Sequence, residues 1–249
     1  MGAVSAWVAN HCSMARAMGT GRHPIQREIG PLERLGIQSR TMNLQEFSAL
    51  VVLATAMSFT PGPNTTLSTA LAANHGLRAA LPFVCAVPLG WALLLLLCSL
   101  GVGGLVMALP GLHRAIQFTG SAYLLWLAWN LIHTRTLAQE PLQTDGSTRP
   151  MRLFWQGVAL QFVNIKAWML ALAIVSGWVA GRPDPGQRLA VVMPVMLVYA
   201  FASNMTYALV GSLLRTWLAG PQGTGLRLMW FNRAMAMVLA LTAMWVLLL

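Results

Sequence analysis

The stretch 58–64, SFTPGPN, lies in the middle of the first long apolar run of the chain, which extends over residues 47–73. Pro61 and Pro63 supply no backbone N–H, and Gly62 between them permits dihedral angles that other residues avoid. A helix that reaches this stretch is expected to break, which leaves carbonyl and N–H groups unpaired inside an apolar segment. At membrane depth such groups are tolerated only against other protein or a water-filled cavity.

The composition of the chain is that of a protein whose solvent is lipid. Of its 249 residues 57% are hydrophobic and 9% charged, whereas a soluble domain carries about 25% charged residues. The formal net charge is +10, with 16 Lys and Arg against 6 Asp and Glu. The basic residues stand singly between apolar runs, which indicates loop charges that set membrane topology and excludes a nucleic-acid partner.

Six apolar runs are each long enough to cross a bilayer, and none shows a polar face. We therefore expect an all-α membrane protein with six transmembrane helices. The runs cover residues 47–73, 81–109, 115–132, 154–180, 189–214 and 229–249.

A second interruption falls in the fourth run, at residues 164–166, NIK. The two breaks occupy similar positions in the first helix of each three-helix half. Because three spans are an odd number, the halves would have opposite orientations, which predicts a 3+3 inverted repeat with interrupted first and fourth helices. Interrupted segments in matching positions are typical of a transporter binding site.

Lys166, in this second break, is the only lysine of the chain. A charge deep in a span costs about 2.5–3.5 kcal/mol on insertion scales and is functional by default. It would attract a substrate carboxylate, bind the carbonyl groups freed at the first break, or carry a proton. The alternative is a side chain that extends along apolar surface to the membrane interface.

Residues 1–41 differ from the rest, with five arginines and no apolar core of signal-peptide length. Met42 directly precedes the first apolar run, so we expect the domain to cover residues 42–249 and the extension to be disordered, without function and the product of a mis-assigned start. The alternative is a disordered basic arm on the membrane surface.

Four segments together resemble the LysE/RhtB family of amino-acid exporters. They are SFTPGPN at 58–64, HGLRAA at 75–80, GSAYLLWLA at 120–128, and FWQG at 154–157 with QFVNIKA at 161–167. The resemblance implies six helices, a bacterial inner-membrane location, and proton-driven export of amino acids or related metabolites. Carried over by position, it also implies the substrate-binding residues Thr60, Pro61, Gly62, Pro63, Asn64, Asn164 and Lys166.

Two departures from the family pattern narrow these expectations. Ile165 stands where the family typically has proline, which weakens the case for a sharp second break. Trp91 follows Gly90, where many members carry an acid, and no Asp or Glu lies deep in any run. Neutral amino acids are therefore favoured over lysine or arginine, and no proton carrier is evident.

The loop arginines predict the orientation. Those at positions 78, 135, 149, 152, 215, 227 and 233 fall on one side of a six-span arrangement, and those at 114, 182 and 188 on the other. The positive-inside rule places the first group in the cytoplasm and both termini outside.

Other functions find little support in the sequence. Cys85 and Cys98 share one run, which disfavours a thiol electron carrier that needs two facing cysteines. No cluster of His, Cys or carboxylates predicts a metal site, a cofactor or a hydrolase, so we expect no enzyme. A non-transporting membrane scaffold and an exporter of another metabolite stay open as alternatives, as does a homo-oligomer.

Overall fold

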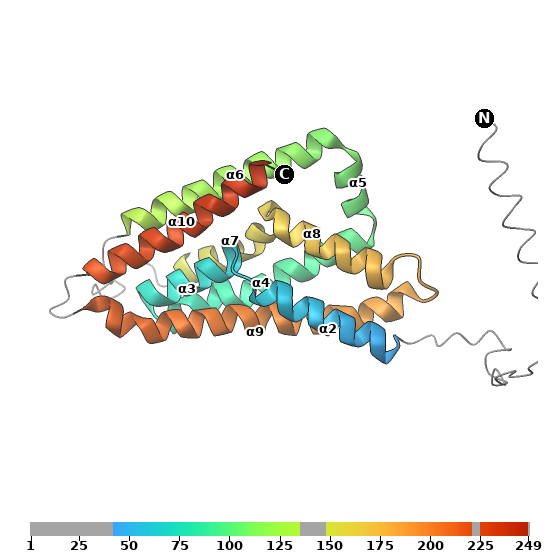
Figure 1. The fold of residues 1–249 in the computed structure, drawn as a ribbon, viewed down its shortest axis with the longest axis horizontal. Helices are drawn as coiled ribbons and strands as arrows, with labels where there is room; N and C mark the ends of the chain where they lie inside the picture. Colours follow the sequence, from blue (N-terminus) through green and yellow to red (C-terminus); the bar gives the residue numbers. More distant parts are fainter. Residues whose placement is uncertain (1–41, 135–147, 221–224, 249) are drawn as a thin grey trace, which may run out of the picture. The chain divides into compact units, whose positions relative to one another are not determined.

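The computed structural model describes residues 42–134, 148–220 and 225–248. The predicted N-terminal extension, residues 1–41, lies outside the described residues. Every regular element in the described ranges is a helix (Figure 1), which confirms the predicted all-α class.

The helices follow one another with short connections. Their bounds are α2 (Leu44–Phe59), α3 (Pro63–His75), α4 (Leu77–Ser99), α5 (Val102–Ala108), α6 (Pro110–His133), α7 (Thr148–Val163), α8 (Ile165–Ile174) with the π-helical turn η2 (Val175–Val179), α9 (Pro185–Ala219) and α10 (Leu226–Leu248).

Three of these helices, α4, α9 and α10, are long and apolar enough to cross a membrane, and α7 with α8 and η2 forms a fourth candidate if the bent pair is one span. Fewer helices therefore meet these criteria than the six predicted spans. The first run is divided into α2 and α3, neither of which reaches 18 residues. Helix α6 is long, but His113, Arg114, Gln117 and Asn130 lower its hydropathy.

Both predicted breaks are present. Helix α2 ends at Phe59 and α3 begins at Pro63, where the N–H of Gly62 donates to the Thr65 hydroxyl at 3.0 Å. The second break bends the chain by 66°. Ile165 stands where the family typically has proline, and the start of α8 is defined instead by Asn164. The side-chain oxygen of Asn164 accepts the N–H of Lys166 at 3.2 Å and caps the helix.

Glycines allow close helix packing at the centre of the bundle. A Cβ at Gly211 of α9 would collide with the carbonyl oxygen of Thr69 in α3, and a Cβ at Gly120 of α6 would collide with that of Val163 in α7. Small residues at membrane helix interfaces let backbones approach in this way. Helix α10 runs beside α6 (Figure 1).

Side-chain contacts identify which helix ends lie together. Asn232, near the start of α10, pairs with Asn74 of α3 through amide hydrogen bonds of 2.8 and 3.0 Å and donates to the Thr134 carbonyl at 3.1 Å. At the opposite end, Glu46 of α2 forms ion pairs with Arg182 at 3.4 Å and Arg188 at 3.1 Å.

The α3–α9 contact gives a stability prediction. Replacing Gly211→Ala forces a methyl group against the backbone of α3, and overpacking of this kind costs about 1–3 kcal/mol. We expect a lower melting temperature for the detergent-solubilised variant. Gly111→Ala is the control, because a Cβ there meets nothing within 4 Å. Equal melting of Gly211→Ala and wild type would contradict the close contact.

The cap of α8 gives a second prediction. Asn164→Ala removes the acceptor for the Lys166 N–H, and loss of an N-cap costs about 0.5–2 kcal/mol. Thermal unfolding should therefore occur at lower temperature in Asn164→Ala, whereas Asn164→Ser, which keeps a capping oxygen, should retain most of the stability. If alanine and serine were equally tolerated, the cap would not be what defines the break.

Candidate substrate pocket at the two helix breaks

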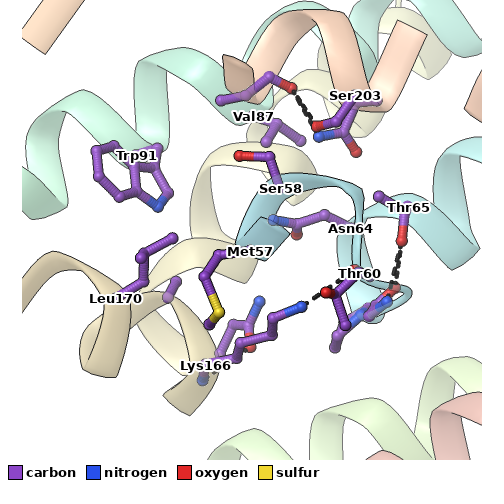
Figure 2. Close-up of a pocket in the computed structure, with 16 residues that line it drawn as sticks. Met57, Ser58, Thr60, Asn64, Thr65, Val87, Trp91, Lys166, Leu170 and Ser203 are labelled. Atoms are coloured by element: carbon purple, nitrogen blue, oxygen red, sulfur yellow. Dashed lines mark hydrogen bonds between the residues drawn. The ribbon is translucent and has the colours of Figure 1, made fainter. Parts of the chain in front are cut away.

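A small cavity, which we call the central pocket, lies where the two breaks meet (Figure 2). Its volume is about 60 Å³, the space of about two water molecules. Its lining residues come from α2, the break that follows it, α3, α4, the second break, α8 and α9. They are Met57, Ser58, Thr60, Gly62, Pro63, Asn64, Thr65, Val87, Trp91, Asn164, Lys166, Ala167, Leu170, Ala200, Ser203 and Asn204.

Six of the seven predicted site residues line the central pocket, and they come from both breaks. The six are Thr60, Gly62, Pro63, Asn64, Asn164 and Lys166. Pro61 is the exception, since it is exposed and absent from the lining. Its side chain serves the break itself, where it supplies no N–H to the end of α2.

Lys166 joins the two breaks directly. Its ammonium Nζ donates to the carbonyl oxygen of Thr60 at 3.1 Å, between positions 106 residues apart (Figure 2). The hydroxyl of Tyr207 donates to the neighbouring carbonyl of Phe59 at 2.9 Å. The last carbonyl groups of a helix have no intrahelical partner. Two side chains from α8 and α9 therefore satisfy two of the carbonyl groups that the first break exposes.

The electrostatic character of the central pocket is positive. Helices α3 and α8 both begin at it, at Pro63 and Ile165, and helix N-termini present N–H groups and a partial positive charge. Lys166 is the only ionisable side chain among the lining residues, which include no acid. This arrangement suits an anionic group, because helix N-termini bind carboxylates and phosphates.

Asn64 is held from α7. Its amide exchanges two hydrogen bonds with Gln161, at 2.9 and 3.1 Å, and Gln161 also donates to the Gly157 carbonyl at 2.9 Å. The side chain of Gln161 is completely buried. The orientation of Asn64 at the pocket therefore depends on a residue that the sequence did not single out as part of the site.

Several further pocket residues were not predicted. Ser203 and Asn204 of α9 form a polar pair inside the fifth apolar run, and that placement is the signal that could have identified them. Asn204 accepts from the Ser68 hydroxyl at 2.9 Å. Trp91 of α4 lines the pocket and is 4% exposed. In contrast, Trp129 is 64% exposed.

No group of three or more His, Cys, Asp or Glu side chains able to hold a metal ion occurs within the described ranges. Many large apolar side chains on the described helices are exposed, among them Val198 at 64%, Leu213 at 78% and Trp230 at 60%. Exposed apolar side chains in such number are expected where helices face lipid.

Comparison with known proteins identifies the family. The profile of the LysE type translocator family matches residues 55–249. A cysteine/O-acetylserine efflux protein of Escherichia coli O1:K1 / APEC is 31% identical over 164 residues, covering 66% of this chain and 80% of the relative. Proteins of the same name from Escherichia coli strain K12 and Shigella flexneri serotype 5b are each 30% identical over 163 residues, with the same coverage.

No solved structure matches the chain. The family and the apolar helices point to a multi-pass membrane transporter rather than an enzyme. The chain belongs to the LysE type translocator family.

Proposed function

We propose that this protein exports neutral amino acids from the cytoplasm, with substrates of the cysteine and O-acetylserine class, and that it binds them in the central pocket. The observation that carries the proposal is the convergence of two helix N-termini and the Lys166 ammonium on one cavity. A substrate carboxylate is the natural partner of this positive group. The substrate class follows the names of the relatives.

The carboxylate lies between the start of α3 and the start of α8 in this proposal. Lys166 is now bonded to the Thr60 carbonyl, and it exchanges that acceptor for the carboxylate when substrate binds. The present bond joins the ammonium to a neutral carbonyl, whereas the new one joins two opposite charges, which attract each other more strongly, so the exchange favours the bound state.

The amino group of the substrate faces neutral oxygen atoms. Ser58, Asn64, Ser203 and Asn204 all line the central pocket, and their hydroxyl and amide oxygens accept hydrogen bonds. The lining includes no acid that would pair with a second positive charge. This supports small neutral substrates over lysine or arginine.

The central pocket must enlarge before it holds an amino acid, because about 60 Å³ is the space of about two water molecules. The two breaks are the natural hinges for that change, since their residues are not held by helical hydrogen bonds on both sides. Movement of one half against the other around a fixed site is the general mode of such transporters.

The proposal takes residues 42–249 as the transporter domain, preceded by an extension without a role in transport. It includes six spans in a 3+3 inverted repeat: α2 with α3, α4 and α6 in one half, and α7 with α8, α9 and α10 in the other. The positions of the arginines support this topology. Arg78, Arg152 and Arg215 fall at one end of the spans, and Arg114 and Arg182 fall at the other.

The end of the spans with more arginines faces the cytoplasm by the positive-inside rule. The membrane is the bacterial inner membrane, as the relatives from Escherichia coli suggest. We also propose coupling to protons. Lys166 is the candidate carrier, because it is the only ionisable side chain among those that line the central pocket.

Export by a Lys166→Met variant tests the function. We expect at least about a tenfold lower rate of O-acetylserine and cysteine export from overproducing cells, since the variant loses one charge-assisted hydrogen bond of about 1.5–3 kcal/mol. Lys166→Arg keeps the charge that binds the carboxylate but cannot release a proton, so it should still bind substrate and yet lose proton-coupled export.

Arg114→Met is the matched control, because it also removes a positive charge but at an exposed position outside the pocket lining. Its export should equal that of the wild type at the same membrane abundance. Export by wild-type cells no faster than by cells lacking the protein would refute the proposed function. Normal export by Lys166→Met would refute the site.

A further inference from the structure

A second and much larger cavity, which we call the side cavity, lies between α3, α6 and α7. Its volume is about 1050 Å³. Its lining combines apolar residues with polar side chains from all three helices. The polar ones are Asn74, His75, Tyr123, Asn130, Arg152 and Gln156. None of the predicted site residues belongs to it.

The side cavity is a wedge that opens toward one end of the bundle. Helices α6 and α7 touch at Gly120 and Val163, where no space exists even for a Cβ. The α6 residues of the lining all follow Gly120, from Tyr123 to Thr134, and the α7 residues all precede Val163. The two helices therefore separate from this contact toward the end that carries Thr134.

That end is the basic one. The Thr134 carbonyl accepts from Asn232 at the start of α10, and Arg215 of α9 lies beside Gly76, since a Cβ on this glycine would be 3.1 Å from the guanidinium. By the positive-inside rule the wedge opens to the cytoplasm.

One face of α3 runs from the central pocket into the side cavity. Asn64 lines the pocket, whereas Leu67, Leu71 and Asn74 line the cavity. Their spacing of three, four and three residues places all four on one helical face. At the N-terminal end of this face, Asn64 forms two hydrogen bonds with Gln161 of α7. We call these two side chains the amide latch.

We propose that the side cavity is a water-filled vestibule through which substrate passes from the cytoplasm to the central pocket, and that the amide latch, Asn64 with Gln161, closes the passage between them. The inference rests on the proposed function and adds a path and a positioning residue to it. Gln161 acts through Asn64: while the latch is closed the pocket is small, and its opening joins the pocket to the cavity.

Water fills this cavity better than a lipid chain does. Asn130 and Arg152 are exposed within the lining, and unpaired amide or guanidinium groups are costly against hydrocarbon. Arg152 and Asn130 lie near the helix ends, at the mouth of the cavity. Tyr123 and Gln156 carry polar groups further along the lining. In membrane proteins polar side chains inside the spans face protein or a water-filled cavity.

Thiol labelling separates water from lipid. The full-length protein, with its three native cysteines replaced by alanine, receives Ala159→Cys in the side cavity or Ala122→Cys outside it. Both alanines are exposed, and each lies a few residues from the Gly120–Val163 contact, so they share a depth. A charged, membrane-impermeant methanethiosulfonate reagent is added to inside-out or right-side-out vesicles.

Because only the hydrated thiolate reacts, we expect Ala159→Cys to react at least about tenfold faster than Ala122→Cys from the cytoplasmic side. Equally slow reaction of the two variants would show that lipid fills the side cavity and would overturn the vestibule. Faster reaction from the outer side would overturn it as well.

The latch has a separate test with Ser58→Cys as the reporter in the central pocket. Adding Gln161→Ala should speed cytoplasmic labelling of this cysteine several-fold. Gln117→Ala is the matched control, because Gln117 is also a buried glutamine but donates to the Val246 carbonyl in α10. Unchanged labelling with Gln161→Ala, or an equal rise with Gln117→Ala, would refute the latch.

Labelling does not require export, so the two proposals can fail separately. Labelling as expected in a protein that exports no amino acid would remove the proposed function and leave a vestibule for another solute. Normal export with a dry side cavity would leave the function and remove the path. Bulky modification of Ala159→Cys should in addition block export if both hold.

Discussion

Unpaired backbone groups at the two breaks determine how the described helices meet. The carbonyl groups of Phe59 and Thr60 end α2 without helical partners, and they accept from Tyr207 of α9 and Lys166 of α8. The start of α8 is capped by Asn164. Since unpaired backbone groups cost several kcal/mol in an apolar environment, these contacts bring both breaks to one place.

Helix α3, which begins at the first break, carries several polar side chains that contact other helices. Helix α3 forms one side-chain link to each of three partners: Asn64 to Gln161 of α7, Ser68 to Asn204 of α9, and Asn74 to Asn232 of α10. A neutral hydrogen bond contributes only about 0.5–1.5 kcal/mol net. Hydrogen bonds of this strength define an arrangement of helices, and each can still be replaced by a hydrogen bond to water or to substrate.

The local chemistry of the breaks was readable from the sequence. Pro61, Gly62 and Pro63 cannot continue a helix, and a lone lysine in an apolar run needs a polar partner. The contact of Lys166 with the first break is one of the three roles that the sequence left open for it. The second break was also predicted, although Ile165 in place of a proline weakened the case for a sharp one. Asn164 defines this break locally, because its side chain caps α8, and the chain bends there by 66°.

Features that depend on which helix faces cross could not be derived in this way. Trp91, Ser203 and Asn204 reach the pocket only because α4 and α9 pack against α3 and α8. Pro61 belongs to the break but is exposed and does not line the cavity that the break creates. Helix α6 is not among the candidate spans, and it carries polar residues such as Gln117 and Ser121 that bond to α10.

The most direct test of the account is whether recognition begins with the carboxylate. Binding of O-acetylserine to the purified protein in nanodiscs is measured in competition with serine, with serine methyl ester and with ethanolamine. If two helix N-termini and Lys166 form the site, serine displaces the ligand, whereas the ester and ethanolamine, which lack a carboxylate, do not. Equal displacement by ethanolamine would contradict the central claim.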